Sequence, residues 1–146
     1  MRLPLLALAS LALAACSNSG ETPAPEAPPP AAPAVLGGVD LGQPVRAIGT
    51  EPFWAVEIAP GTLTYSAVDN PGFSVNNPGP TLQGTTAVYA AAGADGATLV
   101  VTLIATECSD GMSDRVYPLT ARVELGQQTL NGCAASVAFL ESQPAP

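Results

Sequence analysis

The 146-residue chain contains no histidine and no lysine, and its only basic residues are Arg2, Arg46, Arg115 and Arg122. Without histidine there is no Ser-His-Asp or Cys-His catalysis and no imidazole ligand for a metal. Without lysine there is no Schiff-base chemistry. Any catalysis would have to depend on carboxylates, tyrosines or a bound cofactor. We therefore expect a protein that is not an enzyme and that uses no cofactor or metal.

Positive charge is scarce compared with negative charge, because 12 acidic residues face 4 basic ones and the formal net charge is -8. Such a chain has no basic patch with which to neutralise phosphates, so we expect no nucleic-acid partner. The negative charge could attract a cationic protein, although it could equally serve only to keep a small domain soluble.

The N-terminus carries the features of an export signal. The apolar run Leu3–Ala15 is too short to span a bilayer, which takes about twenty residues, but it has the length and flanks of a secretory signal. It ends in Leu13-Ala14-Ala15-Cys16, which resembles the lipobox of bacterial lipoproteins; the alternative is an ordinary signal with a chance cysteine. We predict a signal peptide at residues 1–15 and a membrane anchor of several acyl chains on Cys16.

Two further features predict where the anchored chain lies. Ser17, rather than an aspartate, follows the cysteine, which by resemblance to lipoprotein sorting points to the outer membrane, with the domain facing the periplasm. Ser17–Pro33 has too many prolines for a helix or a sheet and too little to bury. We predict a disordered Pro/Ala-rich linker at 16–36 whose extended part reaches at most about 50 Å.

From Gly37 onward the pattern changes to short β-branched or alternating runs separated by Gly, Pro, Asn and Asp, without helical periodicity. We expect an all-β domain at 37–142, a small antiparallel barrel or sandwich with one disulfide, and a disordered tail at 143–146. The seven or eight expected strands are Val45–Ile48, Phe53–Ile58, Thr62–Ala67, Thr85–Ala91, Ala97–Thr106, Leu119–Leu125 and Thr129–Ala134, with Ser136–Leu140 as the eighth.

Local signals add detail to this expectation. Leu119–Leu125 alternates cleanly between apolar and polar residues, which predicts one buried and one wet face. Gly126-Gln127 suits a two-residue hairpin turn whose first position needs a positive φ. Asn70–Pro80, rich in proline, glycine and asparagine, is expected to be a loop without internal structure.

Cys108 and Cys133 are the cysteines left after lipidation, and export would place them in an oxidising compartment. We expect a structural disulfide across these 133 − 108 = 25 positions, which would contribute roughly 3.5 kcal/mol on the chain-entropy estimate. The alternative of a metal pair or a reactive dithiol lacks a Cys-x-x-Cys spacing.

The stretch from Glu107 to Pro118 is unusually dense in functional side chains. Glu107, Asp110 and Asp114 could hold a hard cation through their oxygens, although the spacing is not that of an EF-hand. Alternatively, Asp110 and Asp114 could form hydrogen bonds to turn backbone.

A second dense stretch contains Glu51 followed by Phe53 and Trp54, and its aromatic rings could simply fill the core. A carboxylate beside two large rings needs water or a cation. We therefore expect an ion pair between Glu51 and Arg115.

Three motifs together resemble a family of uncharacterised bacterial envelope lipoproteins: Gly-Thr-Glu-Pro-Phe-Trp-Ala-Val-Glu-Ile at 49–58, Cys-Ser-Asp-Gly-Met-Ser-Asp-Arg-Val-Tyr-Pro at 108–118 and Leu-Asn-Gly-Cys-Ala at 130–134. The resemblance covers most of 49–134 and supplies no activity. It implies a shared pattern made of Cys108, Cys133, Glu51, Trp54, Asp110, Asp114 and Arg115. A weaker analogy, in overall plan, is to periplasmic inhibitors of C-type lysozyme. The candidate binding residues are Glu51, Phe53, Trp54, Asp110, Met112, Asp114, Arg115 and Tyr117.

We expect a membrane-anchored lipoprotein with a periplasmic domain that binds a ligand or an envelope protein. Three alternatives are open: an inhibitor of a cationic cell-wall hydrolase such as lysozyme, a structural envelope lipoprotein without a small ligand, and a carboxylate-dependent hydrolase. The hydrolase would use Asp110 or Glu51 as acid or base and would need a carboxylate of raised pKa in a pocket.

Overall fold

The structure is a computed structural model that describes residues 33–93 and 96–143. The predicted signal peptide, the predicted lipidation site Cys16, the predicted linker up to residue 32 and the last three residues of the predicted tail lie outside the described residues. Within the part that the structure describes, no helix has the length and apolar character needed to cross a membrane.

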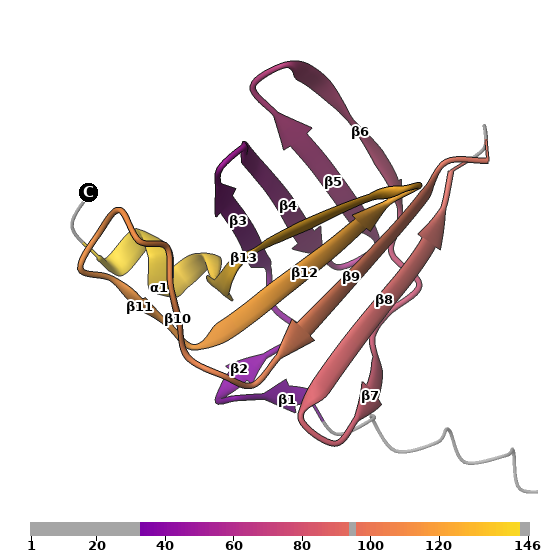
Figure 1. The fold of residues 1–146 in the computed structure, drawn as a ribbon. Helices are drawn as coiled ribbons and strands as arrows, with labels where there is room; N and C mark the ends of the chain where they lie inside the picture. Colours follow the sequence, from indigo (N-terminus) through magenta and orange to yellow (C-terminus); the bar gives the residue numbers. More distant parts are fainter. Residues whose placement is uncertain (1–32, 94–95, 144–146) are drawn as a thin grey trace, which may run out of the picture. The chain divides into compact units, whose positions relative to one another are not determined.

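Nine antiparallel strands form one curled sheet that makes a half-barrel (Figure 1). They are β3 (Val45–Thr50), β4 (Phe53–Ala59), β5 (Thr62–Ala67), β6 (Asn70–Asn76), β7 (Thr81–Gln83), β8 (Thr86–Ala92), β9 (Thr98–Ile104), β12 (Leu119–Leu125) and β13 (Gln128–Ser136). Their order across the sheet is β6-β5-β4-β3-β13-β12-β9-β8-β7. The all-β prediction is confirmed.

Smaller elements are attached to this sheet. One two-stranded sheet pairs β1 (Val35–Leu36) with β2 (Val39–Asp40), and another pairs β10 (Cys108–Ser109) with β11 (Val116–Tyr117). Among the described residues there is one helix, α1 (Val137–Ser142), directly after β13. The domain predicted from residue 37 therefore begins with β1, two residues earlier.

The curled sheet buries alternate side chains on its inner face, as period-2 sequences require. In β12, Leu119, Ala121 and Val123 are fully buried, which confirms the predicted alternation. Gly126, with φ of 55°, opens the predicted two-residue turn between β12 and β13, where an L-residue would be strained. The inner core also includes Val45, Ala47, Trp54, Val56, Ile58, Leu63, Tyr65, Tyr89, Leu99, Val101 and Leu103.

A second, smaller cluster lies on the opposite face of the sheet. Tyr117, Cys133 and Ala135 are buried there, with Phe139 and Leu140 of α1 packed against them. The disulfide between Cys108 and Cys133, with Cα atoms 5.4 Å apart, is confirmed. It attaches β10 to β13 and so holds the small sheet β10–β11 against this face.

Two of the expected elements are wrong. The first 7 residues of the predicted loop Asn70–Pro80 form the edge strand β6. Pro71 lies there at a bulge opposite β5, a position where a missing N–H is tolerated. The predicted strand Ser136–Leu140 is wrong, because most of it is the helix α1. The pairing of β13 with β3 ends at Ser136 and Val45, and Pro44, which precedes Val45, has no N–H with which to extend it. Ser136 then caps the helix, its Oγ accepting the N–H of Phe139 at 3.2 Å.

Candidate functional site

Residues 108–117, here called the arm, comprise β10, β11 and the loop between them (Figure 1). Three contacts hold the arm against the sheet. The disulfide joins its first residue to β13. Tyr117, 1% exposed, packs in one cluster with Cys133 and Ala135. The hydroxyl of Thr50 donates to the carbonyl of Asp110 at 3.3 Å. The arm is thus a fixed wall beside β3 and β4.

Asp110 organises the loop of the arm. Its Oδ1 accepts the N–H groups of Met112 and Ser113 at 3.0 and 2.8 Å, and its Oδ2 accepts the hydroxyls of Ser113 and Tyr117 at 2.8 and 2.9 Å. Partial burial raises the pKa of the Asp110 carboxyl, but these four bonds outweigh it and lower the pKa to about 2. The carboxylate is therefore ionised at neutral pH and serves as an acceptor.

Arg115 and Glu51 do not form the expected ion pair. The guanidinium carbon of Arg115 lies 5.9 Å from the centre of the Tyr117 ring, a cation–π distance. Glu51 is exposed in the two-residue turn between β3 and β4, where it is joined to Pro52 by a cis peptide bond. The ion pairs within 33–93 and 96–143 are Arg46–Glu57 and Arg122–Glu124.

A groove of about 750 Å³ separates the arm from β3, β4 and β5. We call it the arm groove. Six of the eight predicted binding residues line it: Phe53, Trp54, Asp110, Met112, Arg115 and Tyr117. Glu51 lines an adjoining hollow of about 530 Å³, and Asp114 is exposed beside Arg115 without lining the groove. Two motifs far apart in the sequence therefore meet at one cavity.

Several lining residues were not predicted. Ile48, Thr50, Ala55, Ser66, Ala67, Val68 and Ser113 also face the arm groove. Ile48 and Thr50 of β3 and Ala55 of β4 lie beside the motif residues. Strand alternation predicts that they line the groove, once it is known which face of the sheet the groove lies on. Ser66, Ala67 and Val68 belong to β5 and the turn after it, and no signal in the sequence connects them to the arm.

Phe53 and Trp54 have different roles, since neighbouring residues of a strand point to opposite faces. Trp54 is 4% exposed and belongs to the core, as one interpretation of the sequence predicted. A Cβ at Gly49 would lie 2.0 Å from its indole nitrogen, and one at Gly132 would lie 2.9 Å from its ring. The ring is thus pressed against two glycine backbones. Phe53 is 54% exposed, so the alternative interpretation, in which both rings fill the core, is wrong for this residue.

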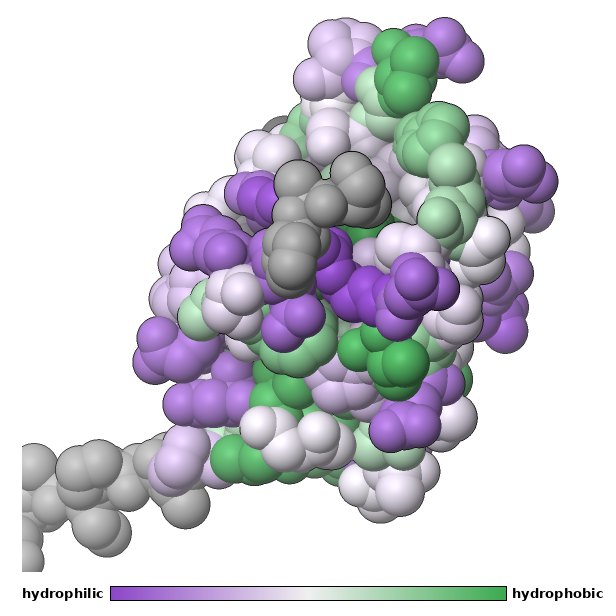
Figure 2. Space-filling view, turned by 90° about the vertical axis from the view of Figure 1, so that its left-hand side faces the viewer, coloured by the Kyte–Doolittle hydropathy of each residue, from purple (hydrophilic) through white to green (hydrophobic). Residues whose placement is uncertain are grey.

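Exposed apolar side chains border the arm groove. Phe53, Val68 and Met112 are 54%, 77% and 67% exposed, and they are three of the six large apolar residues found exposed in the described part of the chain. Figure 2 looks onto the side of the domain that carries the arm and α1, where apolar patches (green) lie between polar ones (purple). Apolar surface at the rim of a concave site is typical of a binding site.

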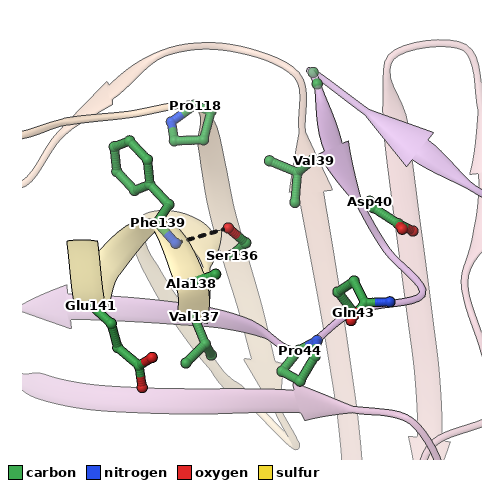
Figure 3. A pocket seen from close by; sticks show the side chains of 12 residues that line it. Val39, Asp40, Gln43, Pro44, Pro118, Ser136, Val137, Ala138, Phe139 and Glu141 are labelled. Atoms are coloured by element: carbon green, nitrogen blue, oxygen red, sulfur yellow. Dashed lines mark hydrogen bonds between the residues drawn. The ribbon is translucent and has the colours of Figure 1, made fainter. Parts of the chain in front are cut away.

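A second cavity, of about 530 Å³, lies between the β1–β2 turn, the start of β12 and α1 (Figure 3). Its labelled walls are mainly apolar, with Pro118 and Phe139 together on one side and Val39 on the other. Asp40 and Glu141 are its acidic residues, and Asp40 already accepts the N–H of Gly42 at 2.9 Å. No predicted binding residue lines it.

The alternative of a cation site is not supported, because Glu107, Asp110 and Asp114 do not gather around one point. Nowhere in the described ranges do three or more His, Cys, Asp or Glu residues gather as a metal would require. The physical reason is that both Asp110 oxygens are directed at N–H and O–H donors of the arm. The alternative of hydrogen bonds to turn backbone is confirmed for Asp110. The Asp114 side chain makes no such bond to a described residue.

No protein-family model, curated protein or solved structure matches the chain. Function is therefore inferred from the sequence motifs and the geometry of the arm groove.

Proposed function

We propose that this chain is a lipid-anchored protein of the bacterial envelope whose β-domain binds a ligand or a partner protein in the arm groove. The observation that carries the proposal is the convergence of Phe53 and Trp54 with Met112, Arg115 and Tyr117 on one cavity. A concave, largely apolar site with a few fixed polar groups is the usual form of a binding site.

The chemistry of the groove favours binding over catalysis. Asp110, the carboxylate in its lining, has a pKa lowered to about 2 by its hydrogen bonds, so at neutral pH it has no proton to give as a general acid. It is also a poor base, because its oxygens already accept four hydrogen bonds. The chain has no histidine or lysine that could act as the general acid or base instead.

The envelope location is supported by the sequence alone. The apolar run that ends at Cys16, with Ser17 after it, predicts acylation and the outer membrane. The extended linker would let the domain reach partners at most about 50 Å from the lipid surface. Labelling with radioactive palmitate checks this part: the wild type should take up label and Cys16→Ser should not.

The binding proposal is tested by capture from an envelope extract with three versions of the chain. Phe53→Ser with Met112→Ser removes apolar rim of the groove, and both side chains are exposed, so the fold should be kept. Leu82→Ser is the matched control, because Leu82 is 46% exposed on β7, outside the groove lining. A partner retained by the wild type and Leu82→Ser but lost with the groove variant supports the proposal. Equal retention by all three contradicts it.

A further inference from the structure

The arm groove continues at both ends into smaller hollows, and each of these contains an exposed carboxylate. Toward the disulfide, it shares Asp110 and Met112 with the hollow of about 530 Å³ that includes Glu51. In the other direction, it shares Phe53 and Val68 with a hollow of about 410 Å³ that includes Asp69. We call the arm groove together with these two adjoining hollows the trough. Phe53, Val68 and Met112 border its middle, and each adjoining hollow has an exposed carboxylate.

The trough is negative overall. Asp110 lies in its wall, and Glu51 and Asp69 lie exposed in its two ends. The guanidinium in the wall is that of Arg115, which lies over Tyr117. The other described arginines, Arg46 and Arg122, form ion pairs with Glu57 and Glu124, and neither lines the trough.

An apolar surface with acidic ends selects its partner by charge as well as by shape. Complementary charges at the rim of an interface steer association and reject partners of the wrong sign, while an apolar side chain in the centre supplies most of the affinity. Phosphate-rich surfaces, including nucleic acids and anionic lipid headgroups, would be repelled by the ends of this trough.

We infer that the partner of the arm groove is a basic protein segment that places an apolar side chain between two cationic ones. This inference rests on the binding function proposed above. The apolar side chain would contact Phe53, Val68 and Met112, and the flanking cations would lie near Glu51 and Asp69. Addition of a strand to the sheet is disfavoured, because the edge strand β6 contains Pro71 and a bulge, and the edge strand β7 has three residues.

The test uses the full chain in a neutral detergent and three short peptides of equal length without tryptophan. Each has the same Leu-Phe-Leu centre, flanked on both sides by Arg, by Gln or by Glu. Trp54 is the only tryptophan, and its buried indole packs against Gly49, which lines the groove, so its fluorescence should change when the site is occupied. Calorimetry gives the affinity independently.

The Arg-flanked peptide should bind best, and its affinity should fall severalfold between about 0.05 and 0.5 M salt. Glu51→Gln and Asp69→Asn should each weaken it about two- to fivefold, as loss of an exposed charge pair does. Glu141→Gln, which removes an exposed carboxylate on α1, is the matched control and should leave binding unchanged. Phe53→Ser with Met112→Ser should abolish the change in Trp54 fluorescence that the peptide causes.

Two contrary results are distinguishable. The basic partner is overturned, while the groove function stands, if the Gln- and Glu-flanked peptides bind as well as the Arg-flanked one. The same conclusion follows if a groove-dependent partner captured from the envelope is insensitive to salt and to Glu51→Gln with Asp69→Asn. If no peptide binds and capture is the same with and without the groove variant, the groove function itself fails, and the inference fails with it.

Discussion

The hydroxyl of Tyr117 donates a 2.9 Å hydrogen bond to Oδ2 of Asp110, which joins a buried ring to the carboxylate that organises the arm. The same oxygen accepts the hydroxyl of Ser113, and Oδ1 accepts two backbone N–H groups. One side chain thus satisfies donors at both ends of the loop. The shape of the groove wall depends on this carboxylate.

Asp110→Asn should therefore destabilise the domain. The amide of asparagine cannot accept hydrogen bonds at both of its ends, so at least the hydroxyls of Ser113 and Tyr117 lose their acceptor. Hydrogen bonds to a charged group are worth about 1.5–3 kcal/mol each when buried, and exposure of this loop reduces that to about 1–2 kcal/mol in total. Urea denaturation at neutral pH measures the loss. Asp114→Asn, on the same loop and exposed, should cost less than about 0.5 kcal/mol; an equal cost for both would contradict the role given to Asp110.

The contribution of Asp110 should disappear in acid. Its pKa is lowered from 3.8 in a free side chain to about 2 in the folded protein, by hydrogen bonds that outweigh the effect of burial. A carboxylate with a depressed pKa adds stability above its unfolded pKa and loses it as the pH falls toward the folded pKa. The difference in unfolding free energy between wild type and Asp110→Asn should therefore be constant near neutrality and shrink between pH 3.8 and about 2. A difference that stays constant over this range would argue against the hydrogen-bonded carboxylate.

Loss of the disulfide should lower the stability of the domain. Cys108 and Cys133 are separated by 25 positions, and opening this loop should lower the free energy of unfolding by roughly 3.5 kcal/mol. The comparison is between the wild type and Cys108→Ala with Cys133→Ala, each measured with and without a reductant. The reductant should destabilise the wild type to about the level of the double variant and leave the variant unchanged. Destabilisation of both by the reductant would point to a cause other than this bond.

The parts of the fold that could be predicted are those with local signals. The bounds of β5 and β12 agree with the expected strands because alternation of apolar and polar residues is written directly in the sequence. The β12–β13 turn has a glycine where a positive φ is needed. By contrast, β1, β2, β7, β10 and β11 have two or three residues each, and such short strands depend on partners supplied by the tertiary structure.

Many of the residues that line the arm groove, the candidate site, could be singled out from the sequence, but their geometry could be predicted only in part. The dense stretches around Phe53 and Asp110 both reach the arm groove. The predicted pair of Glu51 and Arg115 failed because an ion pair depends on the direction of long side chains, which the sequence does not specify. The sequence did not predict that Val68 lines the arm groove, because the curl of the sheet decides which turn faces the arm.

Gly49→Ala should be destabilising because of one neighbour. An added Cβ would lie 2.0 Å from the indole nitrogen of Trp54, its cross-strand partner on β4, so the buried ring would have to move. Overpacking of this kind costs about 1–3 kcal/mol. In a Trp54→Leu background the same Gly49→Ala change should cost clearly less, because the smaller side chain leaves room. Equal costs in the two backgrounds, measured by thermal unfolding as a double-mutant cycle, would rule out the clash.

Two tyrosines should respond in opposite ways to loss of the hydroxyl. Tyr89 is fully buried, and its hydroxyl has no hydrogen-bond partner among the described residues. A buried unsatisfied group costs about 1–3 kcal/mol, so Tyr89→Phe should keep or raise stability at neutral pH. Tyr117→Phe should lower it, because the bond to Asp110 is lost.

Alkaline pH separates the two explanations for Tyr89. Burial raises its pKa from 10.0 to about 12, so the folded state holds a proton that the unfolded state has released. Stability should then fall as the pH rises from about 10 to about 12. Tyr89→Phe should remove part of this fall, measured by urea denaturation at a series of pH values. A loss of stability at neutral pH together with an unchanged alkaline fall would mean that the hydroxyl is satisfied and that other groups titrate in this range.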